Sequence, residues 1–583
     1  MRKFFVTAAL LLPLMYGSVQ AQLPPVFDKQ TAANATGTPT TRKYLPPVRI
    51  VWQEGNLQGV SGLMQPGNGQ ADLSNKNMCI LKPAGNVKPA ILLDFGRELH
   101  GGLQIVTGMW GGNKPVKLRI RFGESVSEAM SNIEPEKNAT NDHAIRDMMV
   151  EVPWLGKLEV GNTGFRFVRI DVVEDVPEVM LKEVRAIFNF RDLPYLGSFN
   201  SSDTLLNKIW LTGAYTVHLN MQDYLWDGIK RDRLVWVGDM HPETSTISTL
   251  FGYNEVVPHS LDLVRDITPL SEWMNGISTY SMWWIIIHRD WYYHNGNLPY
   301  LRQQKAYLLP LLRRISQMID ENNSEKLDGT RFLDWPSSEN PQGIHAGLQA
   351  MMVLSLQAGA ELCKILQEPA AAQECEAAVA RLKKHVPDHN NSKQAAALMA
   401  LSGLASAKEM DDQVINVGGA KEFSTFYGYY MLQAKAKAGN YEGALDAIRT
   451  YWGGMLSIGA TTFWEDFNLD WLNNAGRIDE LVKPGQKDIH GDYGGYCYKG
   501  FRHSLCHGWA SGPTPWLTEH VLGIQVKAPG CKVIKITPHL GDLTFAEGTF
   551  PTPYGILKVK HTKGKDGKIK SEINAPKGVT ILR

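Results

Sequence analysis

The chain has 583 residues, of which 43% are hydrophobic and 20% charged, a composition typical of a folded protein rather than a disordered one. Its 60 lysines and arginines balance 59 aspartates and glutamates, which argues against a protein built to grip nucleic acid or a membrane surface. The 16 tryptophans and 20 tyrosines are the part of the composition that bears on function. Indole and phenol rings offer a flat apolar face with a polar edge, which suits an amphipathic ligand such as a sugar.

The N-terminal segment predicts a signal peptide. Arg2 and Lys3 precede an apolar stretch, and small residues end at Ala21, where we expect cleavage. We therefore predict a signal peptide at 1–21, an extended lead-in at 22–45, and an exported product, periplasmic or secreted and soluble. No later segment approaches the ~18 apolar residues of a membrane helix, so no membrane insertion is expected.

Residues 46–195 have the pattern of strands. Val116, Leu118 and Ile120 alternate with basic residues, which is the period of a half-buried strand. Glycine-rich turns separate several such runs, and no helical period intervenes. We expect an N-terminal antiparallel β-sandwich.

Residues 196–525 show the spacing of apolar residues that is typical of helices. Ser201, Ser202 and Asp203 are candidate N-caps, and apolar residues then recur every four positions. Further helical patterns cover 344–366, 394–404, 425–438 and 441–452. Long loops are expected at 222–245, 270–300, 328–343, 453–475 and 484–508, and these carry most of the Trp, His and acidic residues. Because loops on a rigid scaffold often carry function, we expect the site there.

Residues 526–583 return to a strand pattern. The run 532–536 alternates, and Asp566-Gly567 separates two alternating runs as in a β-hairpin. The chain is thus predicted to be multidomain, with an all-α domain between an N-terminal and a C-terminal antiparallel β-sandwich domain.

The cysteines and acidic residues give no cofactor signal. The six cysteines are scattered without a CxxC pair, so a structural zinc site is not expected, while a Cys497–Cys506 bridge stays open. Asp488, His490 and Asp492 have a metal-like spacing but no second cluster supports them. We expect no metal and no cofactor.

Two segments concentrate groups capable of chemistry. Residues 226–239 combine carboxylates, basic groups and two tryptophans, which fits either an ion-paired loop or a sugar pocket. In 459–467, Glu465 follows Trp464, and a neighbouring indole can desolvate a carboxyl group used in acid–base catalysis. A helix-terminal structural Glu is the alternative. His507 is a candidate hydrogen-bond donor to a substrate.

Together these segments resemble the α-L-rhamnosidases of glycoside hydrolase family 78. Residues 227–239 are similar to that family's D-C-P-Q-R-D-E-R-L-G-W-T-G-D hallmark, with Asp232 in place of the Asp-Glu pair. Trp464-Glu465 resembles the family's Trp-Glu, Asp334-Trp335 its Asp-Trp, and residues 504–507 its S-x-N-H stretch with Cys506 in place of Asn. The flanking β segments resemble its accessory domains.

The resemblance implies an (α/α)6 toroid and an inverting mechanism. Glu465 is then the general base and Asp232 the general acid, with Asp227 or Glu339 as the alternative acid. We expect at least one of the two arginines that flank Asp232 to turn away from it, toward substrate or toward Asp227, because two adjacent cations would oppose its protonation. The resemblance and the sugar-pocket interpretation assign substrate binding to the following residues: Asp227, Arg231, Trp236, Asp239, Trp283, Trp335 and His507.

The function implied is an exo-acting, inverting α-L-rhamnosidase that releases terminal L-rhamnose from plant-type polysaccharides or glycosides. Its expected partner is a rhamnose-containing oligosaccharide or glycoside, and the oligomeric state is left open. One alternative is another (α/α)6 carbohydrate hydrolase or lyase. The other is a non-catalytic sugar-binding protein, since the hallmark here lacks the family's Glu.

Overall fold

The structure is a computed structural model that describes residue 30, residues 35–496 and residues 499–583. The predicted signal peptide, residues 1–21, lies outside the described residues, as does part of the predicted lead-in. Residues 40–583 form one unit, and every element described below belongs to it. In the described part of the chain, no helix is long and apolar enough to cross a bilayer.

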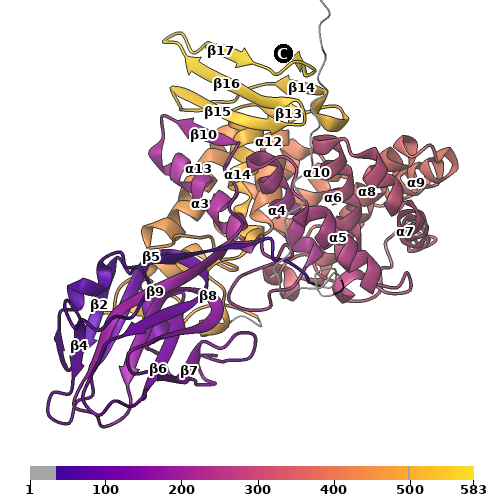
Figure 1. The fold of residues 1–583 in the computed structure, drawn as a ribbon. Helices are drawn as coiled ribbons and strands as arrows, with labels where there is room; N and C mark the ends of the chain where they lie inside the picture. The colour runs from indigo at the N-terminus through magenta and orange to yellow at the C-terminus, as the bar shows by residue number, and fades with distance from the viewer. Residues whose placement is uncertain (1–29, 31–34, 497–498) are drawn as a thin grey trace, which may run out of the picture. The chain divides into compact units, whose positions relative to one another are not determined.

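The N-terminal strands form one hydrogen-bonded sheet in which every pairing is antiparallel (Figure 1). Its main order is β3-β4-β9-β5-β8-β6-β7, with β1 paired to β9 and β2 to β5. The strands are β1 (Thr41–Leu45), β2 (Arg49–Glu54), β3 (Asn56–Gln58), β4 (Cys79–Lys82), β5 (Ala90–Thr107), β6 (Val116–Gly123), β7 (Asp147–Val152), β8 (Lys157–Val172) and β9 (Val179–Phe190), and the short helix α2 (Val126–Met130) follows β6.

The alternating pattern predicted for residues 116–122 is confirmed. Leu118, Ile120 and Phe122 of β6 are fully buried in a hydrophobic core that they share with β5, β8 and β9. The expected lead-in is wrong over residues 41–45, because these residues form β1 and pair with β9. Pairing with a strand almost 150 positions away leaves no local signal in the sequence.

The middle of the chain is helical, as predicted. Its helices are α3 (Thr204–Asn220), α4 (Val237–Leu250), α5 (Val256–Ile267), α6 (Ser278–Asn295), α7 (Leu298–Gln317), α8 (Pro341–Ile365), α9 (Pro369–Leu382), α10 (Lys393–Ser402), α11 (Ala407–Met410), α12 (Gly428–Ala438), α13 (Tyr441–Ser457) and α14 (Pro513–Trp516). Of the three candidates, Asp203 is the N-cap of α3, since its carboxylate accepts hydrogen bonds from the backbone N–H groups of Leu205 and Leu206.

Two of the predicted loops are wrong in large part. Helix α4 occupies most of the second half of the expected 222–245 loop, and α6 fills most of 270–300. Both helices are buried on nearly all sides, so neither shows the one-sided apolar stripe by which an amphipathic helix is recognised. The aromatic and β-branched residues of α6 also have modest intrinsic helix propensity, which its tertiary packing overrides.

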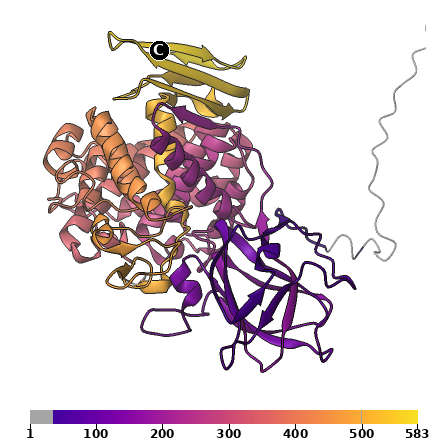
Figure 2. The ribbon, with the colours of Figure 1, turned by 90° about the vertical axis from the view of Figure 1, so that its left-hand side faces the viewer.

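The C-terminal strands include the predicted hairpin, but the expectation that they pair only in antiparallel fashion is wrong, because residues 533–535 pair in parallel with residues 580–582. The strands are β13 (Ile524–Val526), β14 (Val533–Ile536), β15 (Phe545–Thr552), β16 (Gly555–Lys563), β17 (Ile569–Asn574) and β18 (Thr580–Leu582), drawn in yellow in Figure 2. The expected hairpin joins β16 to β17, and Gly567 adopts the positive φ of 78° that its turn requires. Strand β10 (Ser198–Ser201) was not predicted and pairs with β15. The short strands β11 (Ala475–Gly476) and β12 (Lys487–Asp488) pair with each other.

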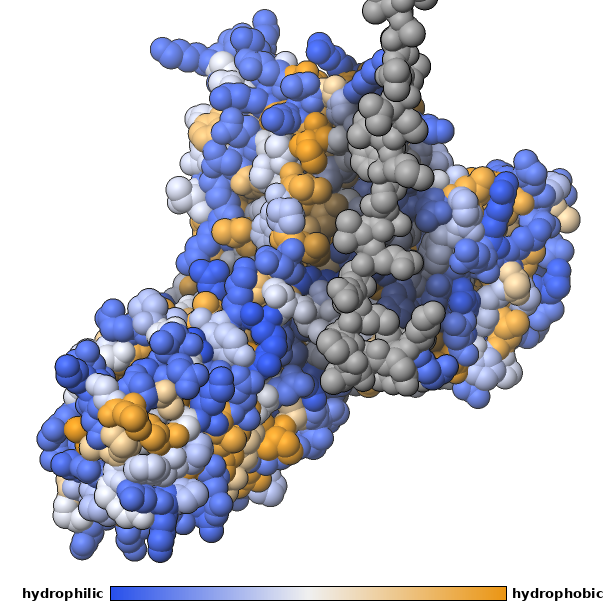
Figure 3. Space-filling view, in the orientation of Figure 1, coloured by the Kyte–Doolittle hydropathy of each residue, from blue (hydrophilic) through white to orange (hydrophobic). Residues whose placement is uncertain are grey.

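The surface carries no single dominant apolar region on the face shown in Figure 3, where hydrophobic residues lie in small groups among polar ones. This distribution is ordinary for a folded protein, since part of every protein surface is apolar. The groups capable of chemistry are instead found in clusters of polar side chains in the interior.

Candidate active site

Glu465 lies where three segments distant in sequence meet. The Arg231 guanidinium donates from Nη2 to both of its carboxylate oxygens, at 2.8 and 2.9 Å, although the two residues are 234 positions apart. The backbone N–H of Ser504 donates to Glu465 Oε2 at 3.2 Å. Glu465 itself is 2% exposed. The hallmark segment, the Trp-Glu loop and the 502–509 segment therefore converge on one carboxylate.

The surroundings of Glu465 favour its ionised form. Burial alone would raise its pKa, but the charges of Arg231 and His507 outweigh burial and hold the pKa below its usual range. A carboxylate that stays ionised at neutral pH can accept a proton from water. This is the property required of a general base.

His507 carries the second positive charge beside Glu465. Its Nε2 donates to Asp239 Oδ1 at 2.9 Å, and its Nδ1 lies 3.9 Å from Glu465 Oε1. Burial opposes the charge, but the neighbouring Glu465 and Asp239 carboxylates raise the pKa of His507 to about 9. His507 and Asp239, both predicted as binding residues, are thus brought together next to the predicted base.

Asp232 is linked to Glu465 through the same guanidinium. Arg231 Nη1 donates to Asp232 Oδ1 at 2.7 Å, and His143 Nδ1 lies 3.2 Å from the same oxygen. Arg233 turns away and donates to the backbone carbonyls of Asn162 and His143. The expectation that one flanking arginine turns away is confirmed, although it contacts backbone carbonyls rather than Asp227. Asp232 and Arg233 both have φ near +50°, which allows these consecutive side chains to diverge.

Asp227 has a different environment from Asp232. It is 2% exposed and accepts a hydrogen bond from the backbone N–H of Leu234 at 3.0 Å. Burial, together with the nearby carboxylates of Asp239 and Asp232, raises its pKa well above the usual range. The surroundings of Asp227 therefore favour retention of a proton.

A small cavity opens beside Glu465. Its volume of about 10 Å³ is close to the ~10–15 Å³ needed by one water molecule. Trp335, a predicted binding residue, lines it and stacks on Tyr496 with ring centroids 6.1 Å apart. Asp466 and Trp509 also line it and were not predicted as site residues. Burial and the adjacent Glu465 charge raise the pKa of Asp466 to about 6, and its position next to Glu465 was the available signal.

The other two predicted tryptophans do not line this cavity. Trp236 caps the start of α4 and packs edge-on against Tyr280. Trp283 lies on α6 and stacks on both His241 and Tyr430, where it lines a separate and larger cavity. The nearby Cys506 is a buried free thiol, and Cys497, its suggested bridging partner, lies outside the described residues.

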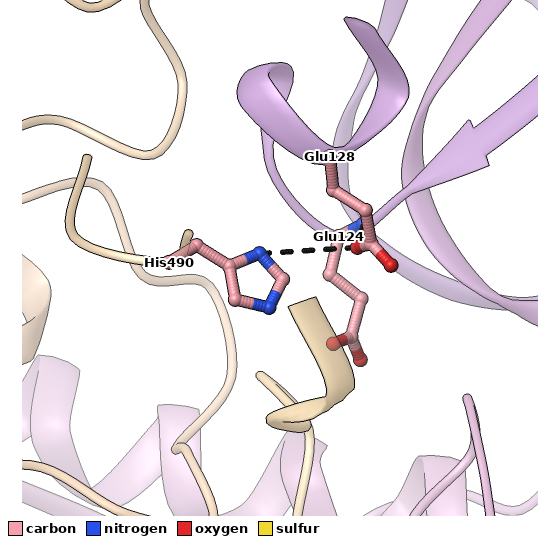
Figure 4. A group of neighbouring side chains, drawn as sticks. All are labelled: Glu124, Glu128 and His490. Atoms are coloured by element: carbon pink, nitrogen blue, oxygen red, sulfur yellow. Dashed lines mark hydrogen bonds and ion pairs between the residues drawn. The ribbon is translucent and has the colours of Figure 1, made fainter. Parts of the chain in front are cut away.

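One buried group has the ligand types and spacing of a cation site. Ligand atoms of Glu124, Glu128 and His490 lie within 4.8 Å of one another (Figure 4). The ammonium of Lys230, however, lies 3.0 Å from Glu124 and 3.4 Å from Glu128 and already supplies positive charge. His490 Nε2 donates to the carbonyl of His503 at 2.9 Å. We interpret the group as an ion-paired support rather than a metal centre.

This group connects the N-terminal sheet to the site. Lys230 also donates to the carbonyls of Phe501 and His503, at 2.8 and 2.7 Å, and Glu124 accepts from the Leu505 backbone N–H at 2.7 Å. It therefore fixes the hallmark segment to the segment that carries Ser504 and His507. Lys230 is adjacent to Arg231, so the same contacts restrict where the guanidinium can lie.

The helical middle of the chain and its C-terminal strands each match a family model. Residues 194–417 match the family model of the bacterial alpha-L-rhamnosidase 6 hairpin glycosidase domain, and residues 523–582 match that of the bacterial alpha-L-rhamnosidase C-terminal domain. The chain is therefore similar to α-L-rhamnosidases over both regions, and the resemblance predicted from the sequence is confirmed.

Individual relatives agree with this assignment. The curated alpha-L-rhamnosidase of Alteromonas sp. (strain LOR) is 23% identical over 531 residues, which cover 82% of this chain and 54% of the relative. The GH78 family rhamnosidase of Bacillus sp. GL1 has a TM-score of 0.70 at 22% identity, covering 90% of this chain and 55% of that one. The Klebsiella oxytoca rhamnosidase with rhamnose bound has a TM-score of 0.64 at 16% identity, covering 82% and 95%. The chain spans about half the length of the first two.

Proposed function

We propose that the protein is an exo-acting, inverting α-L-rhamnosidase that releases terminal L-rhamnose from plant-type polysaccharides or glycosides. The observation that carries the proposal is the Arg231 guanidinium, which joins Glu465 to Asp232 in one buried cluster. Two carboxyl groups facing one sugar are the requirement of glycoside hydrolysis. We further propose that the helical hairpins close into an (α/α)6 toroid flanked by β-sandwiches.

In the proposed mechanism Glu465 activates water. Its low pKa keeps it ionised, and the water-sized cavity beside it provides a place for the nucleophile. The water attacks the anomeric carbon on the face opposite the leaving oxygen, and Glu465 Oε accepts its proton, which gives the inverted sugar. His507 and Arg231 stay cationic and orient the carboxylate.

We assign the general acid to Asp232, at the hallmark position. Its side chain is 10% exposed and therefore reaches the site more readily than the buried Asp227. To donate a proton it must leave Arg231, which remains paired with Glu465. Asp227 is the competing acid because its raised pKa favours the protonated form.

The remaining side chains proposed to contact the sugar are Asp239, Trp335 and His507, with Trp236 at the start of α4.

Proton NMR during hydrolysis of an aryl α-L-rhamnoside tests the reaction directly. We expect free rhamnose whose first-formed anomer is inverted relative to the substrate, and no internal cleavage of a rhamnose-containing polysaccharide. Retention of configuration would exclude the water-activating role of Glu465. Binding of rhamnosides without any hydrolysis would instead support a non-catalytic sugar-binding protein.

A further inference from the structure

A second cavity, which Glu465 does not line, lies between several helices. Its volume is about 570 Å³, within the ~300–1,000 Å³ of typical ligand sites. Residues of α4, α6, α8 and α12 line it, among them Thr249, His294, Glu361 and Gln433. The two cavities share no lining residue.

An ion-paired network lines this second cavity. Arg289 donates from Nη1 to Asp290 Oδ1 at 2.7 Å and from Nε to Glu361 Oε2 at 2.9 Å, while His241 Nε2 lies 3.1 Å from Asp290 Oδ2. The side chains of Asp290, Arg289 and Glu361 are 30%, 35% and 43% exposed. Although burial opposes it, the hydrogen bond from His241 and the charge of Arg289 hold the pKa of Asp290 below its usual range.

The inner wall of the cavity is aromatic. Trp283 stacks on both His241 and Tyr430, with interplanar angles of 22° and 19° and centroid distances of 4.7 and 4.8 Å. Leu354 and Phe550 add apolar surface. The cavity therefore combines rigid ring edges and aliphatic groups with charged groups that are already oriented by each other.

The charged side chains that line the cavity limit the class of ligand that it can bind. The carboxylates of Asp290, Glu361 and Glu519 outnumber the cations of Arg289 and Lys527, which disfavours an anionic ligand. Arg289 already donates hydrogen bonds to two of those carboxylates, which disfavours a metal ion. Carboxylate oxygens in such pairs retain lone pairs that accept from hydroxyl groups, and a sugar ring has the matching apolar face.

We propose that this cavity is a second, non-catalytic binding site for a neutral saccharide. The saccharide hydroxyls donate to Asp290 and Glu361 and accept from Arg289, and its ring packs against the aromatic wall. The proposal does not depend on the hydrolytic function proposed above, because the site shares no side chain with the Glu465 cluster.

Isothermal titration calorimetry on the Glu465→Gln variant tests this site while hydrolysis is blocked. The probes are L-rhamnose, D-glucose, cellobiose and maltose, each titrated to tens of millimolar. We expect saturable binding of at least one probe, weakened about tenfold by Glu361→Gln, since loss of one charge-assisted hydrogen bond is worth about that factor. Glu374→Gln is the matched control, since Glu374 is an exposed glutamate on α9, 3.8 Å from Arg313 and outside the cavity.

Leu354→Trp gives an independent test by placing a larger side chain in the lining of the cavity. It should weaken the same binding while leaving the hydrolysis of an aryl α-L-rhamnoside by the otherwise unchanged protein as it was. Circular dichroism and thermal melting confirm that each variant is folded. The proposal is overturned if no probe saturates, or if Glu361→Gln and Leu354→Trp bind every probe as tightly as Glu374→Gln does.

Discussion

Removing the Arg231 guanidinium should shift the pH dependence of the reaction. Arg231→Gln deletes the charge that contacts Glu465 at 2.8 Å and leaves a neutral side chain of similar length. Since the charge lowers the pKa of Glu465, its loss raises that pKa. A base protonated at higher pH is inactive over a wider acidic range, so the acidic limb of kcat/KM moves to higher pH.

The size of the shift follows from the separation of the charges. Two unit charges ~4 Å apart interact by ~4 kcal/mol at an effective dielectric constant of ~20. At about 1.4 kcal/mol per pKa unit this is about 3 units, an upper value because His507 remains as a second cation. Opposite charges at such distances usually shift a carboxyl pKa by about 1–3 units. We therefore expect the acidic limb to move by about 1–3 pH units.

The assay is kcat/KM for an aryl α-L-rhamnoside between about pH 3 and 9, with Arg233→Gln as the matched control. Arg233 is two residues away and contacts backbone carbonyls instead of a carboxylate. The acidic limb of kcat/KM for Arg233→Gln should therefore stay at the wild-type pH. If Arg231→Gln lowers the rate but leaves the limb unmoved, then Glu465 is not the titrating base.

Three further changes test the remaining assignments. Glu465→Gln should reduce kcat by about 10²–10⁴ with the fold intact, and near-normal turnover would reject it as the base. Asp232→Asn should slow hydrolysis of a natural disaccharide far more than that of an activated aryl rhamnoside; equal losses would make Asp232 a binding residue and direct attention to Asp227→Asn. Lys230→Met leaves two buried carboxylates without their ammonium and should lower the free energy of unfolding in urea by about 3–5 kcal/mol. Lys137→Met removes a more exposed pair and should cost under about 1 kcal/mol; equal effects would contradict a supporting role for Lys230.

Much of the architecture was predictable because its causes are local. The alternation through β6, the Asp203 cap of α3 and the Asp566-Gly567 turn depend on residues close together in sequence, and each lies where expected. The spacing within residues 226–239 similarly allowed comparison with a family hallmark. Prediction failed where burial decides the structure: α6 is packed on nearly all sides and lacks a one-sided pattern.

Local patterns along the chain indicate the order of strand-rich and helical segments and supply the chemical groups from which a site can be built. Which of those groups meet depends on the packing of distant segments. That packing joins Arg231 to Glu465 and Asp232, turns Arg233 away, places Trp283 on a different cavity, and uses Glu124, which directly follows β6, to support the site. These contacts link residues separated by tens to hundreds of positions, and their energies depend on burial and mutual charge, which local spacing does not encode.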